Sequence, residues 1–343
     1  MAHPAGIDLV GLQGEQRGFV DLKQRDGRPV LEDLWVMQGS LCDLKCKHCY
    51  TASSPTNHLL EQIRFDELRP HLDDARSYGV QKIYFTGGEV FVDEDVLAGR
   101  AATNEEFLKS LEYSLSIAPV EILTNGRRYI RNHFDALQAL FRKHGERLRL
   151  RISLESFEPG EHDAIRGRGT FVRTVDTVCD LAAMGFVPVI NAERPFLGVL
   201  SDDDIRKGFQ DLFASKGVTV EVNLIENVME MGHQLVRLQN NGKKPTPEVF
   251  ITTNCFGILN KPADSLMCHF SRCVQKIGGR IRYYPCPVIY NDNRFDLGGT
   301  LEESFQRVYL GHKNCYDYCM KGRGATCRTH PIGSGEAAVL QET

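Results

Sequence analysis

The distribution of cysteines constrains this chain more than any other feature of its sequence. Eleven cysteines occur in 343 residues. One compact group comprises Cys42, Cys46 and Cys49, and Cys179 stands alone. The remaining seven are Cys255, Cys268, Cys273, Cys286, Cys315, Cys319 and Cys327. Cytosolic thiols stay reduced, so grouped cysteines there favour metal binding over disulfides. Two separated groups predict two metal centres, whereas Cys179, on a helical pattern, is expected in the core.

The composition excludes several classes of partner. Forty-one Lys and Arg oppose 45 Asp and Glu, which gives a net charge of −4. This balance offers no electrostatic case for binding nucleic acid or a membrane surface. The N-terminus lacks a basic segment followed by an apolar stretch, and no apolar run approaches the ~20 residues that cross a bilayer. The sequence therefore predicts a soluble, cytoplasmic protein.

Short β-branched runs alternate with amphipathic helical patterns between about residues 33 and 225. The expected strands are Leu34–Met37, Lys82–Phe85, Val120–Leu123, Leu148–Ser153, Val187–Ile190 and Val218–Leu224. The expected helices are Phe65–Tyr78, Asn104–Ile117, Ile130–Lys143, Phe171–Met184 and Asp202–Phe213. Strands separated by helices indicate βαβ units around a parallel sheet. We predict an α/β fold, a partial (β/α)6 TIM-like barrel with its chemistry at the carboxyl ends of the strands.

Two regions flank the expected barrel of residues 33–225. Residues 1–32 form an N-terminal extension, with a hairpin expected at Gly18–Val30. Residues 226–343 carry most of the cysteines, which predicts a small loop-rich domain held by metal rather than by a large core. Within it, Lys276–Pro287 is expected to form a hairpin that turns at Gly278-Gly279. The insertion Asp93–Thr103 is expected to be a surface loop.

The first cysteine group, Cys42-Asp-Leu-Lys-Cys46-Lys-His-Cys49, has C-x3-C-x2-C spacing and directly follows the first expected strand. Three thiolates can hold a [4Fe–4S] cluster and leave its fourth iron open to a substrate, whereas four would close the cluster. A zinc site completed by His48 and three unrelated thiols are the alternatives. Zinc usually takes pairs of ligands such as C-x2-C, which disfavours the zinc alternative.

With Tyr50 immediately after it, this cysteine loop resembles that of the radical S-adenosylmethionine (SAM) superfamily. Thr86-Gly87-Gly88-Glu89 resembles the family's GGE motif, which binds the SAM amino group, although Val90 replaces the usual proline. Leu123-Thr124-Asn125-Gly126 matches its TNG motif. The resemblance implies that Tyr50, Gly87, Gly88, Glu89 and Asn125 belong to the SAM site.

Two further motifs extend the resemblance. Ser153-Leu-Glu155-Ser156 resembles the family's Ser-Leu-Asp-Gly, with Glu and Ser as replacements, and implies that Ser153 contacts the SAM ribose or carboxylate. His162-Asp163-Ala-Ile-Arg166-Gly167 resembles a segment whose arginine pairs with the SAM carboxylate, here Arg166. The family reduces SAM with its cluster and releases a 5′-deoxyadenosyl radical that abstracts hydrogen from substrate carbon.

The C-terminal cysteines resemble SPASM and twitch extensions, which hold auxiliary iron–sulfur clusters. Too few cysteines are present for the full SPASM pattern, which implies one auxiliary [4Fe–4S] cluster. The expected ligands are Cys273, Cys286, Cys315 and Cys319, with Cys268 and Cys327 as substitutes. Four ligands would make this cluster an electron acceptor, an open site would make it a substrate anchor, and a structural zinc is the alternative.

Three further residues are candidates for catalysis. Cys255 could donate hydrogen to a substrate radical, as in radical epimerases of similar architecture, although a lone cysteine is more often an inert buried residue. Glu193 and Glu226 follow the fifth and sixth expected strands, where substrate-facing side chains belong; Arg194 lies beside Glu193. Salt bridges within the barrel are the equally favoured alternative for these acids.

The resemblance leaves the substrate open. Few residues precede Cys42, which disfavours a leader-peptide-binding domain there and favours a small hydroxylated or amino-bearing substrate of the sugar or aminocyclitol type, oxidised or epimerised at carbon. A ribosomal-peptide-modifying enzyme that forms a thioether, a carbon–carbon bond or a D-residue is the first alternative. A non-enzymatic iron–sulfur electron carrier is the second. A flavodoxin- or ferredoxin-type protein is the expected electron donor.

Overall fold

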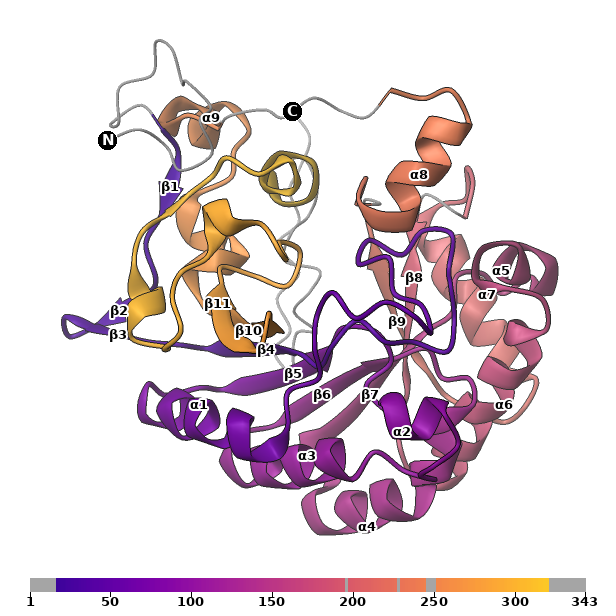
Figure 1. Cartoon of the computed structure of the whole chain (residues 1–343). Helices are drawn as coiled ribbons and strands as arrows, with labels where there is room; N and C mark the ends of the chain where they lie inside the picture. Colours follow the sequence, from indigo (N-terminus) through magenta and orange to yellow (C-terminus); the bar gives the residue numbers. More distant parts are fainter. Residues whose placement is uncertain (1–16, 195–196, 227–228, 245–250, 321–343) are drawn as a thin grey trace.

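An eight-stranded sheet organises the computed structural model, which describes residues 17–194, 197–226, 229–244 and 251–320. The strand order is β11-β10-β4-β5-β6-β7-β8-β9 (Figure 1). Six parallel strands form the barrel part: β4 (Asp33–Met37), β5 (Lys82–Thr86), β6 (Val120–Thr124), β7 (Leu148–Ser153), β8 (Val189–Glu193) and β9 (Glu221–Ile225). The predicted α/β partial barrel is therefore confirmed.

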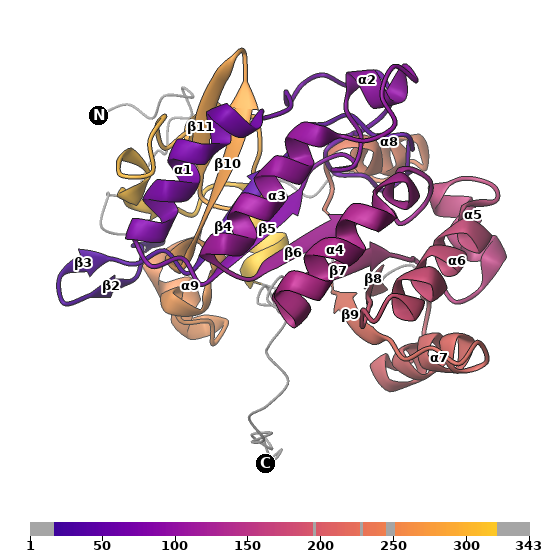
Figure 2. The ribbon, with the colours of Figure 1, turned by 90° about the horizontal axis from the view of Figure 1, so that it is seen from below.

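Helices cover the outer face of this sheet (Figure 2). They are α1 (Phe65–Ser77), α3 (Glu105–Ile117), α4 (Phe134–His144), α6 (Thr170–Ala183) and α7 (Asp202–Ala214), with the shorter α5 (Pro159–Arg166) beside them. In α1 the buried residues Leu68, Leu72 and Ala75 recur at helical spacing and form the stripe that packs on the sheet. All five residues of β4 are buried, as expected of a parallel strand covered on both faces.

Several expected boundaries differ from the structure. Strand β9 begins at Glu221 rather than Val218, and α4 begins at Phe134 rather than Ile130, after a 3₁₀-helix over Tyr129–His133. Strand β8 begins at Val189 rather than Val187, because Pro188 has no N–H to donate to the ladder. The insertion Asp93–Thr103 contains a one-turn helix, α2 (Glu94–Leu97), whose first turn is capped by the Asp93 side chain accepting from the Val96 N–H. These differences are local and leave the order of elements unchanged.

The C-terminal hairpin extends the barrel sheet. It consists of β10 (Ser271–Ile277) and β11 (Arg280–Tyr284), turning at Gly278-Gly279, both of which have positive φ. Strand β10 pairs in parallel with β4, so that Ser271 lies opposite Asp33. The hairpin was expected, but its position beside the first barrel strand was not, since pairing between distant segments leaves no local signal.

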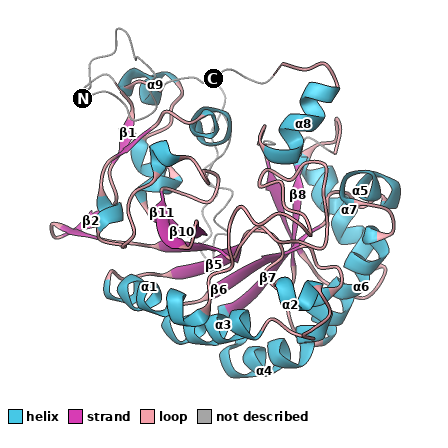
Figure 3. Cartoon of the chain, in the orientation of Figure 1, coloured by secondary structure: helices cyan, strands magenta, loops and turns pink. Residues whose placement is uncertain are grey.

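The remaining elements are short and lie around this hairpin and above the barrel (Figure 3). Strands β2 (Gln24–Arg25) and β3 (Arg28–Pro29) form the expected N-terminal hairpin, and β1 (Phe19–Val20) pairs with β12 (Val308–Tyr309). Helices α8 (Gly232–Asn240) and α9 (Thr253–Ile258) follow the barrel, and a π-helix spans Cys315–Met320. Among the described residues, no helix has the length and apolar character of a membrane span.

Candidate active site

A cavity of about 170 Å³ lies at the carboxyl ends of the barrel strands, beside the cysteine loop. Side chains and backbone from the ends of β5, β6, β7 and β8 line it together with that loop. Among them are most of the residues expected in the SAM and substrate sites: Cys46, Cys49, Tyr50, Gly87, Gly88, Asn125, Ser153, Arg166 and Glu193. The structure thus brings together motifs that the sequence separates widely.

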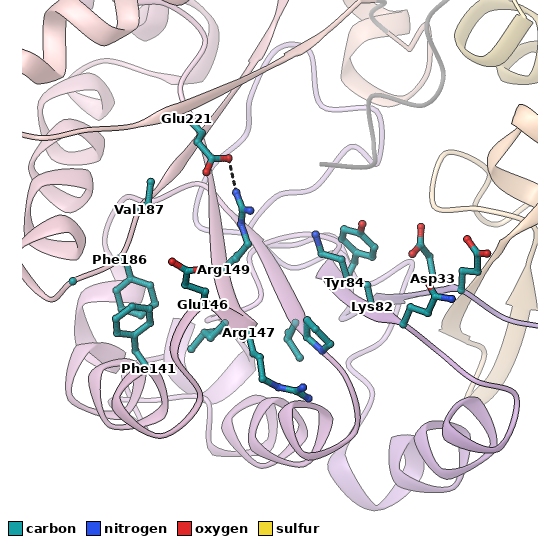
Figure 4. Close-up of a pocket in the computed structure, with 16 residues that line it drawn as sticks. Asp33, Lys82, Tyr84, Phe141, Glu146, Arg147, Arg149, Phe186, Val187 and Glu221 are labelled. Atoms are coloured by element: carbon teal, nitrogen blue, oxygen red, sulfur yellow. Dashed lines mark hydrogen bonds and ion pairs between the residues drawn. The ribbon is translucent and has the colours of Figure 1, made fainter. Parts of the chain in front are cut away.

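A larger cavity of about 670 Å³ opens at the opposite end of the barrel (Figure 4). The residues that line it come from the amino ends of the strands, including Lys82, Leu148 and Glu221. Its charged groups already have partners: Arg149 pairs with Glu221 at 2.5 Å, and Lys82 pairs with the buried Glu121. Parallel barrels carry their chemistry at the other end, so the smaller cavity is the candidate site.

The three thiols of the cysteine loop lie close together and receive hydrogen bonds. Cys42 and Cys46 are buried and pack around Leu44, and Cys49 packs against them. Asn125 Nδ2 lies 3.7 Å from Cys42 Sγ, and Arg166 Nη1 lies 3.8 Å from Cys46 Sγ. Burial raises the pKa of the Cys46 thiol to about 12, against the opposing effect of Arg166. Such thiols ionise when metal binds, and the neighbouring donors then stabilise their sulfurs.

The two glycines of the GGE motif place this loop. Gly87 has φ of 126°, and a Cβ on it would lie 2.4 Å from the Gly39 carbonyl oxygen. The Gly88 N–H donates to that same oxygen, and the Glu89 N–H donates to the Leu41 carbonyl, both at 2.8 Å. The motif therefore packs backbone against backbone on the segment that leads into Cys42, a role separate from binding SAM.

Glu89 is already engaged by the end of β6. Its carboxylate accepts from Thr124 Oγ1 and from the Asn125 N–H, both at 2.7 Å. Burial, and then the nearby Asp43, raise the pKa of Glu89 to about 7. Asp43 in turn accepts from Asn125 Nδ2 at 2.8 Å and pairs with Arg127 at 3.2 Å. One network thus joins the cysteine loop, the GGE motif and the TNG motif.

A second charge network lies across the cavity. Glu155 Oε1 accepts from Nε and Nη2 of Arg166 at 2.9 and 2.6 Å, and His48 Nε2 lies 3.2 Å from the same oxygen. Burial alone would raise the pKa of Glu155, but Arg166 and His48 hold it well below its usual range. Burial and the neighbouring Glu155 raise the pKa of Glu193 well above its usual range. Arg166 therefore pairs with a protein carboxylate in this structure.

Two contacts that fix the cysteine loop had no signal in the sequence. The His233 N–H, at the start of α8, donates to the Cys49 carbonyl at 2.9 Å, and His233 Nδ1 lies 3.0 Å from the Cys46 carbonyl oxygen. Tyr50 donates through its hydroxyl to the Pro287 carbonyl at 3.2 Å, and Tyr290 donates to the Tyr50 carbonyl at 2.7 Å. The loop is thus held by segments from later in the chain.

Four C-terminal thiols gather around a second, small cavity: Cys268, Cys286, Cys315 and Cys319. Burial raises the pKa of the Cys286 thiol well above its usual range, and the next causes are Cys319, Cys268 and Cys315. Cys273 lies elsewhere, in mid-strand, where Gln275 Nε2, on the same face, is 3.7 Å from its sulfur. The thiols around this cavity thus include Cys268, one of the expected substitutes, in place of Cys273, and Cys327 lies outside the described residues.

The two thiol groups share a wall. Val288 lines both the active-site cavity and the small C-terminal cavity. Tyr318 lines the active-site cavity from the π-helix that carries Cys315 and Cys319. Any cofactor bound by the C-terminal thiols would therefore lie next to the space where substrate reacts.

Both donor sets consist of thiols, the ligands that hold iron–sulfur clusters. Among the described residues, no three His, Cys, Asp or Glu side chains converge on a point that one metal ion would fill. In a [4Fe–4S] cluster each thiolate binds a different iron, so its ligands stand further apart than those around zinc. The ten described cysteines are all free thiols. Three thiols beside the first cavity, and four around the second, match an open and a closed cluster.

Two expected catalytic residues are not among those that line the active-site cavity. Cys255 sits in the first turn of α9, where its thiol is 3.4 Å from both the amide nitrogen and Oγ1 of Thr252. Glu226 follows β9, but the cavity wall there is formed by Ile225 and Met229. Neither residue belongs to the wall of this cavity as the structure describes it.

Comparison with known proteins identifies the barrel. A family model described as the radical SAM superfamily matches residues 38–212, which is half of the chain. The crystal structure of Streptococcus suis SuiB bound to S-adenosylmethionine has a TM-score of 0.52 at 15% identity, covering 78% of this chain and 63% of that one. SuiB bound to its precursor peptide SuiA also has a TM-score of 0.52, at 13% identity, covering 81% and 65%. At these identities the likeness concerns the fold.

Two curated relatives match parts of the chain. The antilisterial bacteriocin subtilosin biosynthesis protein AlbA of Bacillus subtilis is 30% identical over 138 residues, 40% of this chain and 27% of AlbA. GTP 3′,8-cyclase 3 of Mycobacterium bovis is 28% identical over 216 residues, 62% of this chain and 52% of the cyclase. The matched segments therefore span about half of these relatives' length or less.

Proposed function

The chain belongs to the radical SAM superfamily, and we propose on that premise that it oxidises a carbon centre of an amino- or hydroxyl-bearing substrate. A single observation carries this proposal. A set of three thiols lies beside the active-site cavity, a set of four lies around the small cavity, and the two cavities share Val288 in their walls. When bound at Cys42, Cys46 and Cys49, a cluster with one open iron supplies the electron that cleaves SAM.

The residues around the first cavity would position SAM and shield the site. Gly87 and Gly88 hold the cysteine loop, and Asn125 and Arg166 stabilise its sulfurs. Ser153 lies at the carboxyl end of β7, where it can contact SAM. Arg166 would bind SAM through Nη1, because its other two nitrogens donate hydrogen bonds to Glu155. Apolar walls at Met229 and Val288 exclude water.

Glu193 is the residue we propose to face the substrate. Its Oε2 is buried and has no hydrogen-bond partner among the described residues, and the side chain lines the cavity. A buried acceptor of this kind favours a substrate amine or hydroxyl as donor. After hydrogen abstraction from the adjoining carbon, Glu193 in its ionised form, whose raised pKa makes it a strong base, would take the proton of that group as the carbon–heteroatom double bond forms. The remaining electron would pass to the auxiliary cluster.

The auxiliary site supports oxidation over epimerisation. Cys268, Cys286, Cys315 and Cys319 supply four thiolates, which leave no iron open for substrate and suit an electron acceptor. Epimerisation would instead need a hydrogen donor in the cavity, and Cys255 does not reach it. The proposal therefore assigns the auxiliary cluster to electron transfer and drops Cys255 from catalysis.

A peptide is the second candidate substrate. SuiB has been solved with a precursor peptide, and AlbA is named for bacteriocin biosynthesis. Under this alternative, the amino or hydroxyl group that meets Glu193 belongs to a residue of a peptide. Assaying 5′-deoxyadenosine with amino sugars, aminocyclitols and peptides in parallel separates the two, because only the right class stimulates its formation.

Anaerobic reconstitution tests the assignment. We expect about eight irons per chain and 5′-deoxyadenosine on addition of dithionite and SAM, since each [4Fe–4S] cluster contributes four irons. Replacing Cys42, Cys46 and Cys49 together by Ala should abolish SAM cleavage and leave about four irons. Cleavage by that variant would overturn the assignment of the first site, and a zinc content of one per chain would overturn that of the second.

A further inference from the structure

Arg272, in β10, is a fully buried arginine without a carboxylate partner in the part of the chain that the structure describes. Its Nε donates to the Ser304 carbonyl at 2.8 Å. Its Nη1 donates to the carbonyls of Cys268 and Ser271, both at 2.7 Å. Nη2 is buried and has no hydrogen-bond partner among the described residues. All these acceptors are neutral, so no carboxylate among the described residues offsets the positive charge.

A buried charge of this kind is costly unless an anion lies nearby. Taking a guanidinium out of water costs several kcal/mol, and interior charges are therefore paired. The groups that would place negative charge beside Arg272, once they are ionised by metal binding, are the thiols of Cys268 and Cys286. Another arginine that acts on this thiol group, Arg294 near Cys315, is already paired with Asp292 at 2.6 Å. Within residues 251–320, Arg272 thus stands without a carboxylate partner beside the C-terminal thiols.

We propose that Arg272 is the counter-charge of the auxiliary cluster and raises the reduction potential of that cluster. The inference rests on the proposed cluster at Cys268, Cys286, Cys315 and Cys319. Four thiolates around an iron–sulfur core give a net anion, and reduction adds one further negative charge. A fixed positive charge in a low-dielectric interior stabilises the reduced form more than the oxidised one. Arg272 would thereby make the auxiliary cluster a better acceptor for the substrate's electron.

The same side chain also ties the segment of Cys268 to a second segment. Nη1 donates to the carbonyl of Cys268, while Nε donates to the carbonyl of Ser304, in the 3₁₀-helix Glu303–Phe305. A purely structural role would require only these hydrogen bonds. The electrostatic role makes a separate prediction. It depends on the charge of Arg272 and changes the midpoint potential of the auxiliary cluster, which packing alone does not set.

The experiment measures the midpoint potential of the auxiliary cluster alone. The full chain carrying Cys42→Ala, Cys46→Ala and Cys49→Ala is reconstituted with iron and sulfide and titrated, with reduction followed by electron paramagnetic resonance. Into this parent we introduce Arg272→Met, Arg272→Gln or Arg272→Lys. Arg282→Gln on the neighbouring strand is the matched control, because Arg282 is neutralised by Asp296 at 2.8 Å.

We expect both neutral variants to shift the midpoint to more negative potential, by about 59 mV if the one-electron equilibrium changes tenfold. Arg272→Lys should restore most of the potential, and Arg282→Gln should match the parent. Loss of iron from both neutral variants, but not from Arg272→Lys, would also support a required counter-charge. A neutral variant with four irons and the parent's midpoint would overturn the inference. A parent without iron would instead overturn the proposed auxiliary cluster.

Discussion

A Cβ atom on Gly88 would lie 1.9 Å from the carbonyl oxygen of Leu41, the residue before the first cysteine of the loop. The clash is with backbone, which cannot rotate away as a side chain can. The Gly88 N–H also donates to the Gly39 carbonyl, so the two segments are locked in register. The glycine therefore fixes the cysteine loop before any cofactor is bound.

Substituting Gly88 by Ala should prevent assembly of the first cluster. The clash with Leu41 must be relieved by moving the cysteine loop, at a cost of about 3 kcal/mol or more. We expect about four irons per chain after reconstitution instead of about eight, no SAM cleavage, and a lower melting temperature. Gly160→Ala is the control, because no atom lies within 4 Å of a Cβ at that helical position. Full iron content in Gly88→Ala would show that the loop tolerates the shift.

Two neighbouring cysteines should differ sharply in their effect on iron content. Cys268 lines the small cavity with the other thiols, whereas Cys273 faces Gln275 in mid-strand. We expect Cys268→Ser to lose the auxiliary cluster and Cys273→Ser to keep it, as measured by iron and sulfide analysis. Each substitution replaces one buried thiol by a hydroxyl, so each variant controls for the general effect of that change on the other. The reverse outcome would restore the ligand set expected from the sequence.

The pair of Glu155 and Arg166 should stabilise the metal-free protein. Arg166→Met leaves Glu155 buried beside Glu193 with no guanidinium, and removing one partner of a buried pair costs about 3–5 kcal/mol. Urea unfolding at neutral pH measures the loss. Arg168→Met, at an exposed position two residues further on, is the control and should change stability by less than about 0.5 kcal/mol. Equal urea midpoints for the two variants would contradict a stabilising role of the Glu155–Arg166 pair.

His162 should make the folded protein sensitive to mild acid. Its Nδ1 accepts from the Glu155 N–H at 3.1 Å, and burial, followed by Arg166, lowers the pKa of His162 from 6.5 to about 4. Between these values the unfolded chain binds more protons than the folded one, so stability falls as pH drops from 6.5 towards 4.

We expect this loss to approach about 1.4 kcal/mol per pH unit in that window. Denaturant unfolding of the wild type and of His162→Asn at several pH values isolates the contribution of His162. The other titrating groups contribute equally to both proteins and cancel in the difference. The free-energy difference between them should shrink as pH falls. A difference that stays constant from pH 6.5 to pH 4 would exclude His162 as the source.

The barrel could be predicted from sequence because its signals are local. Each strand is a short apolar run, each helix carries its own stripe and cap, and the motifs follow the strands directly. The three-cysteine loop likewise lies within one short segment, so its spacing alone indicates an open cluster. These features need no knowledge of which distant segments meet.

The choice of auxiliary ligands could not be predicted in the same way. Cys268 and Cys273 are close in sequence, and only the pairing of β10 with β4 decides which of them faces Cys286 and the π-helix. Likewise, no local signal in the sequence indicated that Glu155, which replaces the family's aspartate, would reach the guanidinium of Arg166. Both outcomes depend on tertiary contacts between separate elements.

The pairing of β4 with β10 also bears on how the chain is made. Strand β4 is synthesised early, yet one of its two hydrogen-bonding edges stays open until the late hairpin has left the ribosome. All five of its residues are apolar or buried in the final sheet, and such an edge invites pairing with other chains. Nascent or truncated chains ending before Ser271 should therefore aggregate, and slower, cooler synthesis should favour the native protein.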